Sequence, residues 1–152
     1  MILDLAAETI AEEVLYITGK AILEEDDDMF TTSCALPHLM ETSKGRHIIT
    51  TEAELSDTLS SVRRYMKRND IVDLVRTVVS ARFIDADTIE STHVSLMVGK
   101  NGETTRSPYP VYSVIRRFGS SWKIVSSLYA ILDNEEHNNA LLSGGKLWQT
   151  EK

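Results

Sequence analysis

The spacing of apolar residues changes along the chain, from a helical period in the first half to a strand-like alternation after residue 70. The helical pattern is clearest near the N-terminus, where apolar residues recur every three or four positions at Leu3, Ala6, Ile10, Val14 and Ile17. Gly19 is placed to end this helix. The chain therefore begins with an amphipathic helix that needs a core to cover its apolar stripe.

A hairpin and a further helix are predicted before the alternating region. Residues 34–41 and 46–50 read as extended segments joined by Lys44-Gly45, which predicts a short hairpin at a sheet edge. Thr51-Glu52-Ala53-Glu54 is a capping box, in which Thr51 accepts from the amide of Glu54 and Glu54 accepts from the amide of Thr51. We expect a helix from this point to Asn69-Asp70.

Four strand-like segments follow, at residues 71–85, 88–99, 104–118 and 121–132. Asn101-Gly102 is a pair favoured in tight hairpin turns, so segments that are neighbours in sequence should pair in the sheet. Helices first and an antiparallel run of strands afterwards indicate an α+β fold with the helices on one face of a bent, mostly antiparallel sheet. In the first strand, we expect the core face to carry Val75, Thr77, Val79, Ala81 and Phe83.

The last two strands are apolar on both faces. Trp122, Ile124 and Leu128 lie on one face, and Val125 and Tyr129 lie on the other. Helices can cover only one face, and a large exposed apolar patch is unfavourable for a monomer. We expect either a two-fold homodimer formed sheet to sheet or a C-terminal tail, with Leu141, Leu142 and Trp148, folded over the second face.

Composition narrows the class of protein. The 152 residues suit one domain, and the formal charge of -7 opposes binding to nucleic acid. Arg63-Arg64 and Lys67-Arg68 form a basic patch with acidic neighbours, which is typical of a solvated helix face. The single cysteine cannot form an intramolecular disulfide, no export signal is recognisable, and no apolar run approaches about 20 residues, so we expect a cytoplasmic protein without membrane spans.

The order of these elements resembles one known superfamily. A first helix ending near Gly19, a short helix with Asp27, Asp28 and Phe30, the Leu36-Pro37 strand, a third helix and long strands ending in Trp122-Lys123-Ile124 are similar to the nuclear transport factor 2-like (SnoaL-like, cystatin-like α+β) superfamily. The resemblance covers about residues 3–132 and makes residues 133–152 a tail. It implies a cone-shaped sheet wrapped round the helices, a pocket at the open end and frequent dimerisation through the sheet.

The resemblance also allows a test for enzyme activity. Ketosteroid isomerases of this superfamily use a carboxylate base just before a proline on the first strand, where this chain has Ala35 and Leu36 ahead of Pro37. Their aromatic hydroxyl from the first helix could correspond to Tyr16, but the later strands offer His93 and Arg116 in place of a protonated acid. Isomerase chemistry in its known form is not supported, and whether the chain is an enzyme stays open.

The candidate ligand-binding residues are polar or aromatic side chains that could line a pocket. His93 shares its strand face with Ser91 and Ser95, and either His93 or His38 could move protons; an ordinary solvent-facing role is the alternative for each. Arg76 would favour an anionic ligand such as a carboxylate, unless it pairs with Glu12 or Glu13. Tyr65 and Tyr112 could close a pocket or could instead be core residues, and Tyr16 is the remaining candidate through the resemblance.

No cofactor or metal is indicated. The four histidines lack zinc-site spacing, and the acidic run from Glu24 to Asp28 lacks the ligand spacing and glycine of a calcium loop. Two functions remain. One is a small-molecule-binding cone protein, with a possible lyase or isomerase activity on an apolar or anionic metabolite, in which Arg76, His93 and Tyr16 converge on one cavity. The other is a dimeric interaction module whose cone is filled by side chains.

Overall fold

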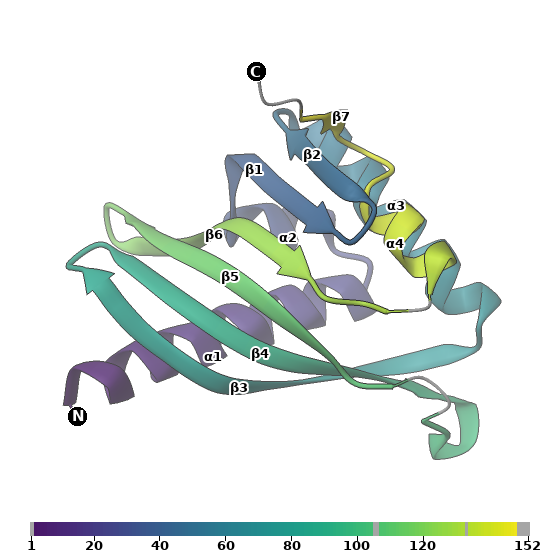
Figure 1. The fold of residues 1–152 in the computed structure, drawn as a ribbon, viewed down its shortest axis with the longest axis horizontal. Helices are drawn as coiled ribbons and strands as arrows, with labels where there is room; N and C mark the ends of the chain where they lie inside the picture. Colours follow the sequence, from purple (N-terminus) through teal and green to yellow (C-terminus); the bar gives the residue numbers. More distant parts are fainter. Residues whose placement is uncertain (1, 105–106, 133, 149–152) are drawn as a thin grey trace.

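The computed structural model describes residues 2–104, 107–132 and 134–148. Its helices are α1 (Ile2–Leu23), α2 (Asp27–Thr32), α3 (Glu52–Arg68) and α4 (Glu135–Leu141), with a short 3-10 turn at Lys100–Gly102. The strands are β1 (Cys34–Thr42), β2 (Gly45–Ile49), β3 (Ile71–Asp85), β4 (Thr88–Gly99), β5 (Tyr109–Phe118), β6 (Ser121–Tyr129) and β7 (Lys146–Leu147). Figure 1 shows α1 behind the long strands and α3 beside α4.

All seven strands form one sheet in the order β3-β4-β5-β6-β1-β2-β7. The pairs are antiparallel except for β1 with β6, which run parallel. The expected α+β class, with N-terminal helices and a mostly antiparallel sheet, is therefore confirmed, as is the pairing of sequence neighbours from β3 to β6. Strand β3 has no neighbour on its other side, so its edge is open among the described residues.

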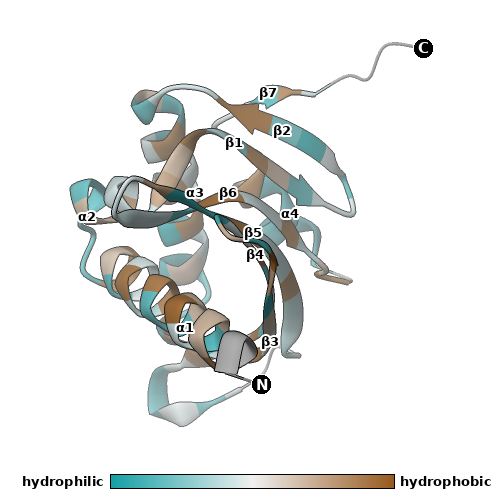
Figure 2. Cartoon of the chain, turned by 90° about the vertical axis from the view of Figure 1, so that its left-hand side faces the viewer, coloured by the Kyte–Doolittle hydropathy of each residue, from teal (hydrophilic) through white to brown (hydrophobic). Residues whose placement is uncertain are grey.

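Helix α1 packs against the inner face of the sheet through small side chains. Ala7, Ala11 and Val14 join Ile89 and Ile115 in one apolar cluster, and Ala6, expected on the buried stripe, is exposed. The real stripe is rotated by about one position because alanines at 7 and 11 let the helix approach the strands closely. Figure 2 shows the sheet bending past α1 and α3.

Helix α3 forms a second apolar cluster on the same face. Its buried Leu55, Leu59 and Met66 pack with residues of the sheet and with Leu141 and Leu142 of the C-terminal segment. The predicted capping box is present in part, because Thr51 Oγ1 accepts from Glu54 N at 3.1 Å. The Glu54 carboxylate accepts from the amide of Thr50 at 2.8 Å, one residue earlier than expected.

A bulge in β3 reverses which face of that strand is buried. The pairing with β4 shifts between Val78 and Ser80, and an extra residue in one strand changes the facing of everything beyond it. Ala81 and Phe83 face the core as expected. Up to and including the bulged residue Val79 the prediction is wrong, because Val75 and Val79 are 45% and 61% exposed while Arg76 turns inward.

The C-terminal segment does not cover the outer face of the sheet. Helix α4 packs on α3, and β7 pairs with β2 at the sheet edge. Gly144 fixes this path, since a Cβ there would lie 2.1 Å from Glu54 O. Val75, Val79, Tyr112 and Leu128 are exposed on the outer face, so the alternative of a covering tail is wrong.

Arg63 holds α1, α2 and α3 together. Its Nε and Nη2 donate to Ile22 O and Ala21 O at the C-terminal end of α1, each at 3.2 Å. Its Nη1 lies 2.6 Å from Asp27 Oδ1 at the start of α2, and the arginine side chain is only 11% exposed. This arginine of the expected basic patch is therefore an internal connection between helices.

Replacing Arg63 by Met should lower the free energy of unfolding by about 2–4 kcal/mol, because two carbonyls and one carboxylate lose a charged partner. Urea unfolding measures the change. Arg64→Met, at the exposed neighbouring position, is the control and should change stability by less than about 0.5 kcal/mol. Equal effects of the two substitutions would contradict this role of Arg63.

Candidate functional site

A small cavity of about 50 Å³ lies between the helices and the inner face of the sheet. Helix α3 supplies apolar side chains to its wall, including Leu55, Leu59 and Val62, and Met40 and Met97 add flexible ones from β1 and β4. Most of the polar side of the wall comes from the strands, and α3 and α4 add one residue each. Its members are His38, Thr58, Arg76, His93, Ser95, Tyr109, Ser113, Ser127, Tyr129 and His137.

Strand register explains why these polar groups meet. Arg76 of β3 pairs with Ser95 of β4, which pairs with Tyr109 of β5, so the three lie in one row across the sheet. The next row contains His93 and, two strands away, Tyr129, joined through Val111. Residues in one such row point to the same face. The cavity wall is therefore built by the alternation of β3 to β6.

Arg76 is the charged group of this cavity. Its Nη1 donates to Thr18 Oγ1 at 2.8 Å and to Leu15 O at 3.3 Å, both on α1. Nε is buried, and no described residue accepts a hydrogen bond from Nε or Nη2. Burial lowers the pKa of Arg76, although a guanidinium stays protonated at neutral pH. A positive charge thus lies inside the fold with two free donors.

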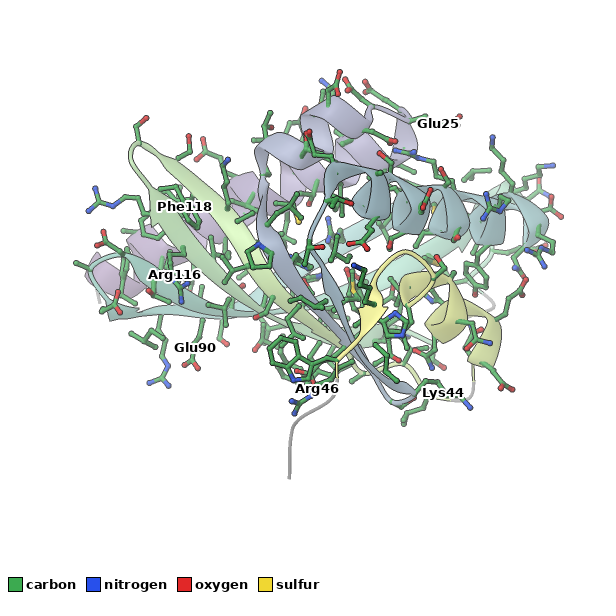
Figure 3. All side chains as sticks on the ribbon, turned by 90° about the horizontal axis from the view of Figure 1, so that it is seen from above. Glu25, Lys44, Arg46, Glu90, Arg116 and Phe118 are labelled. Atoms are coloured by element: carbon green, nitrogen blue, oxygen red, sulfur yellow. The ribbon has the colours of Figure 1, made fainter. Side chains whose placement is uncertain are left out.

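The expected pairing of Arg76 with Glu12 or Glu13 is wrong. Both glutamates are exposed on α1, and no carboxylate among the described residues lies within ion-pair distance of Arg76. No aspartate or glutamate lines the cavity either. Figure 3 labels two other acidic residues, Glu25 and Glu90, whose side chains point away from the body of the molecule.

His93 is the second unsatisfied group of the cavity. It is 1% exposed, and neither ring nitrogen has a hydrogen-bond partner in the described part of the chain. Burial, and then the nearby Arg76, lower the pKa of His93 to about 3. The imidazole is therefore neutral at physiological pH. A buried ring with two free nitrogens is typical of a site that a water or ligand completes.

His38 and Cys34 form the other polar part of the wall. His38 Nδ1 lies 3.3 Å from both Cys34 Sγ and Ile124 O. Burial lowers the pKa of His38 to about 4 and raises the pKa of Cys34 to about 12. The thiol is thus protonated and unreactive at neutral pH, and neither His38 nor His93 titrates near pH 7.

Three of the six predicted ligand-binding residues meet at the cavity. His38, Arg76 and His93 line it, whereas Tyr16 is 69% exposed on α1 and Tyr112 is 46% exposed on the outer face of the sheet. Tyr65 is buried beneath the cavity wall, stacks on His137 and accepts from Asn134 Nδ2 at 2.7 Å. The expected convergence of Tyr16 with Arg76 and His93 in one cavity is therefore wrong.

Two tyrosines that the sequence analysis did not select lie beside Arg76. Tyr109 and Tyr129 line the cavity from β5 and β6, and burial raises the pKa of both phenols. The alternation of residues along β5 and β6 could have identified these tyrosines, but only once it is known which face of each strand points to the cavity. The arrangement combines one cation, neutral hydrogen-bonding rings and hydroxyls, which is chemistry suited to holding an anion.

The described residues contain no cluster of three metal-ligating side chains. Among the same residues, none of the helices combines the length and apolarity that crossing a membrane requires. No protein-family model matches the chain, and no curated protein does.

Several solved structures share the fold. A cystatin-like protein of unknown function from Nostoc punctiforme has a TM-score of 0.66 at 14% identity, covering 86% of this chain and 80% of its own. An NTF2-like protein from Novosphingobium aromaticivorans has a TM-score of 0.64 at 15% identity, covering 91% and 90%. Another protein of that organism, proposed to be an aromatic ring hydroxylase, has a TM-score of 0.60 at 13% sequence identity. The match covers 86% of this chain and 92% of that protein. The chain therefore has the nuclear transport factor 2-like, cystatin-like fold.

The burial of His38 and His93 predicts a loss of stability in acid. Both have ordinary pKa values near 6.5 and lowered values of about 3 and 4 in the folded protein, so the unfolded chain binds more protons below about pH 6.5. Each histidine should therefore reduce the free energy of unfolding by about 1.4 kcal/mol for every unit by which the pH falls between about 6.5 and 4. Urea unfolding at pH 7 and pH 5 measures this effect.

The double variant His38→Gln/His93→Gln should lose most of the pH dependence of the free energy of unfolding, and each single variant should lose about half of it. The comparison uses the difference between the two pH values within each variant, which cancels any packing change. A double variant with the full dependence of the unmodified protein would contradict the assignment of the effect to these histidines.

Proposed function

We propose that the protein binds a small organic anion and holds its carboxylate at Arg76, beside His93. The observation that supports this proposal is the Arg76 guanidinium, which is enclosed by the fold with Nε and Nη2 unpartnered and no carboxylate of the described residues within ion-pair distance. Nε–H and one Nη2–H of a guanidinium point in the same direction and match the two oxygens of a carboxylate. Arg76 thus presents a complete bidentate binding edge.

The surroundings support an anion more than a neutral ligand. A ligand carboxylate would neutralise a charge that the protein otherwise leaves unpaired in a low-dielectric environment. The neutral His93 ring can donate one hydrogen bond to the ligand carboxylate. The Tyr109 and Ser95 hydroxyls lie in the same row of the sheet as Arg76. The apolar wall from α3 would exclude water from these contacts.

Binding is supported better than acid-base catalysis. A lyase or isomerase needs a base that titrates near neutral pH. The two histidines selected as proton carriers, His93 and His38, have pKa values lowered to about 3 and 4. The third cavity histidine, His137, is stacked on Tyr65, and no carboxylate lines the cavity among the described residues. We therefore propose a binding protein, acting in the cytoplasm as expected from the sequence, with no reaction assigned.

A second proposal concerns association of two copies through the outer face of the sheet. Val75, Val79, Tyr112 and Leu128 are exposed there, and the C-terminal segment lies elsewhere. A two-fold contact of the sheets would bury all four on each chain. The modest cavity is compatible with the alternative of an interaction module, and the dimer can coexist with ligand binding.

Arg76→Met should abolish binding of acetate and propionate without lowering stability. Thr18 Oγ1 and Leu15 O keep partners within α1, so the substitution orphans no acceptor and removes an unpaired buried charge. The free energy of unfolding should stay equal or rise by up to about 2 kcal/mol. Calorimetric titration and urea unfolding measure the two effects.

The matched control is Arg82→Met on the same strand, where the exposed guanidinium pairs with Glu90. It should leave carboxylate binding unchanged. Acetamide, which has the shape of acetate without its charge, should bind at least tenfold more weakly. Equal binding of acetamide and acetate, or full binding by the Arg76→Met variant, would overturn the proposed function.

Val79→Glu should convert a dimer to a monomer, because it places a charge within the proposed apolar contact. Sedimentation should change from twice 17.1 kDa to a single chain mass. Leu147→Glu, at a comparably exposed position on β7, is the control and should stay dimeric. A monomeric unmodified protein at micromolar concentration would remove the dimer proposal.

A further inference from the structure

A groove of about 550 Å³ runs along the outside of the fold between α1 and the edge strand β3. Its apolar surface comes from Leu15, Leu23, Leu74 and Val78, and the aromatic ring of Tyr16 is exposed beside them. Arg76 borders both this groove and the interior cavity. The same side chain therefore contacts both a small interior space and a larger open one.

We propose that this groove holds the apolar body of the ligand whose carboxylate binds Arg76, so that the ligand is an amphiphilic monocarboxylate with a medium-length aliphatic chain. This inference rests on the proposed function and extends it. It assigns the ligand class and a second binding region, and it gives Tyr16 a contact with the apolar body of the ligand.

The sizes of the two spaces support this arrangement. A cavity of about 50 Å³ has room for about one carboxylate group, since one water occupies about 30 Å³ of liquid. The body of a larger ligand cannot follow the carboxylate inward. Sites for small molecules usually measure about 300–1,000 Å³, and the groove falls in that range.

Access from the groove to Arg76 depends on α1. Gly19 faces the guanidinium, and a Cβ at this position would lie 3.6 Å from Arg76 Nη1 and 3.8 Å from Arg76 Cδ. The helix wall next to Arg76 thus has no side chain. Gly19 is buried against Arg76, and both residues line the groove, so a ligand in the groove can contact the Arg76 side chain there.

Charge at the groove favours one carboxylate on the ligand. Glu12, Lys20 and Glu24 lie at the rim, and none of them forms an ion pair with another described residue. Together they carry one net negative charge, whereas Arg76 adds one positive charge at the inner wall. A second anionic group at the rim would be repelled, and an apolar chain would not be.

The test is a titration series with straight-chain carboxylates from propionate to decanoate, all below the concentration at which they form micelles. Affinity should rise about threefold to fourfold per added methylene group while the chain lies in the groove. Decanol, which has the chain without the charge, should bind at least tenfold more weakly than decanoate. Arg76→Met should remove binding of the short and long acids alike.

Tyr16→Glu should weaken decanoate binding at least tenfold and change propionate binding less than twofold. Leu5→Glu is the matched control, because Leu5 lies on the same helix with 66% exposure against 69% for Tyr16 but does not line the groove. It should change neither titration by more than twofold. Circular dichroism of both variants verifies that α1 stays folded.

The possible results separate the two claims. If propionate binds through Arg76 but decanoate binds no tighter, or if Tyr16→Glu and Leu5→Glu act alike, the groove assignment is overturned and the proposed function stands. If no carboxylate binds, both are overturned. If decanol matches decanoate and Arg76→Met has no effect, binding is non-specific and the groove assignment again fails.

Discussion

The buried charge of Arg76 is the constraint on which the proposed site depends. The guanidinium lies where the apolar cluster of α1 meets that of α3, and its bonds to Leu15 O and Thr18 Oγ1 use only Nη1. A charge in such a place is unfavourable unless it is paired. Burial, and then the charge of Arg76, keep the nearby imidazole of His93 neutral by lowering its pKa, and the two free guanidinium donors set the chemistry of any ligand.

Arg63 shows how the same residue type behaves when its role is structural. It binds two helix carbonyls and Asp27, so every edge of its guanidinium has a partner. Arg76 has comparable enclosure and no acidic partner among the described residues. The contrast between these two arginines within one chain separates a group that joins helices from a group that remains available to a ligand.

The sequence predicted the element types and their order because periodicity and turn residues are local signals. Such signals account for the change from helical to strand periodicity near residue 70, for the capping oxygen of Thr51 and for the inward position of Ala81. The facing of Val75 and Val79 could not be predicted, because the bulge after Val78 depends on pairing with β4. Arg76 and His93 were selected by residue type, whereas Tyr109 and Tyr129 required the register of four strands.

The central claim is that Arg76 presents free Nε and Nη2 donors to a carboxylate. Arginine-selective proton–nitrogen NMR observes the Nε–H group directly, and the Arg76→Met variant assigns its signal. The account predicts that the Arg76 Nε–H signal shifts downfield and exchanges more slowly with water as propionate is added, while the signals of Arg63 and Arg82 stay in place. An Arg76 signal that does not change at saturating propionate would contradict the account.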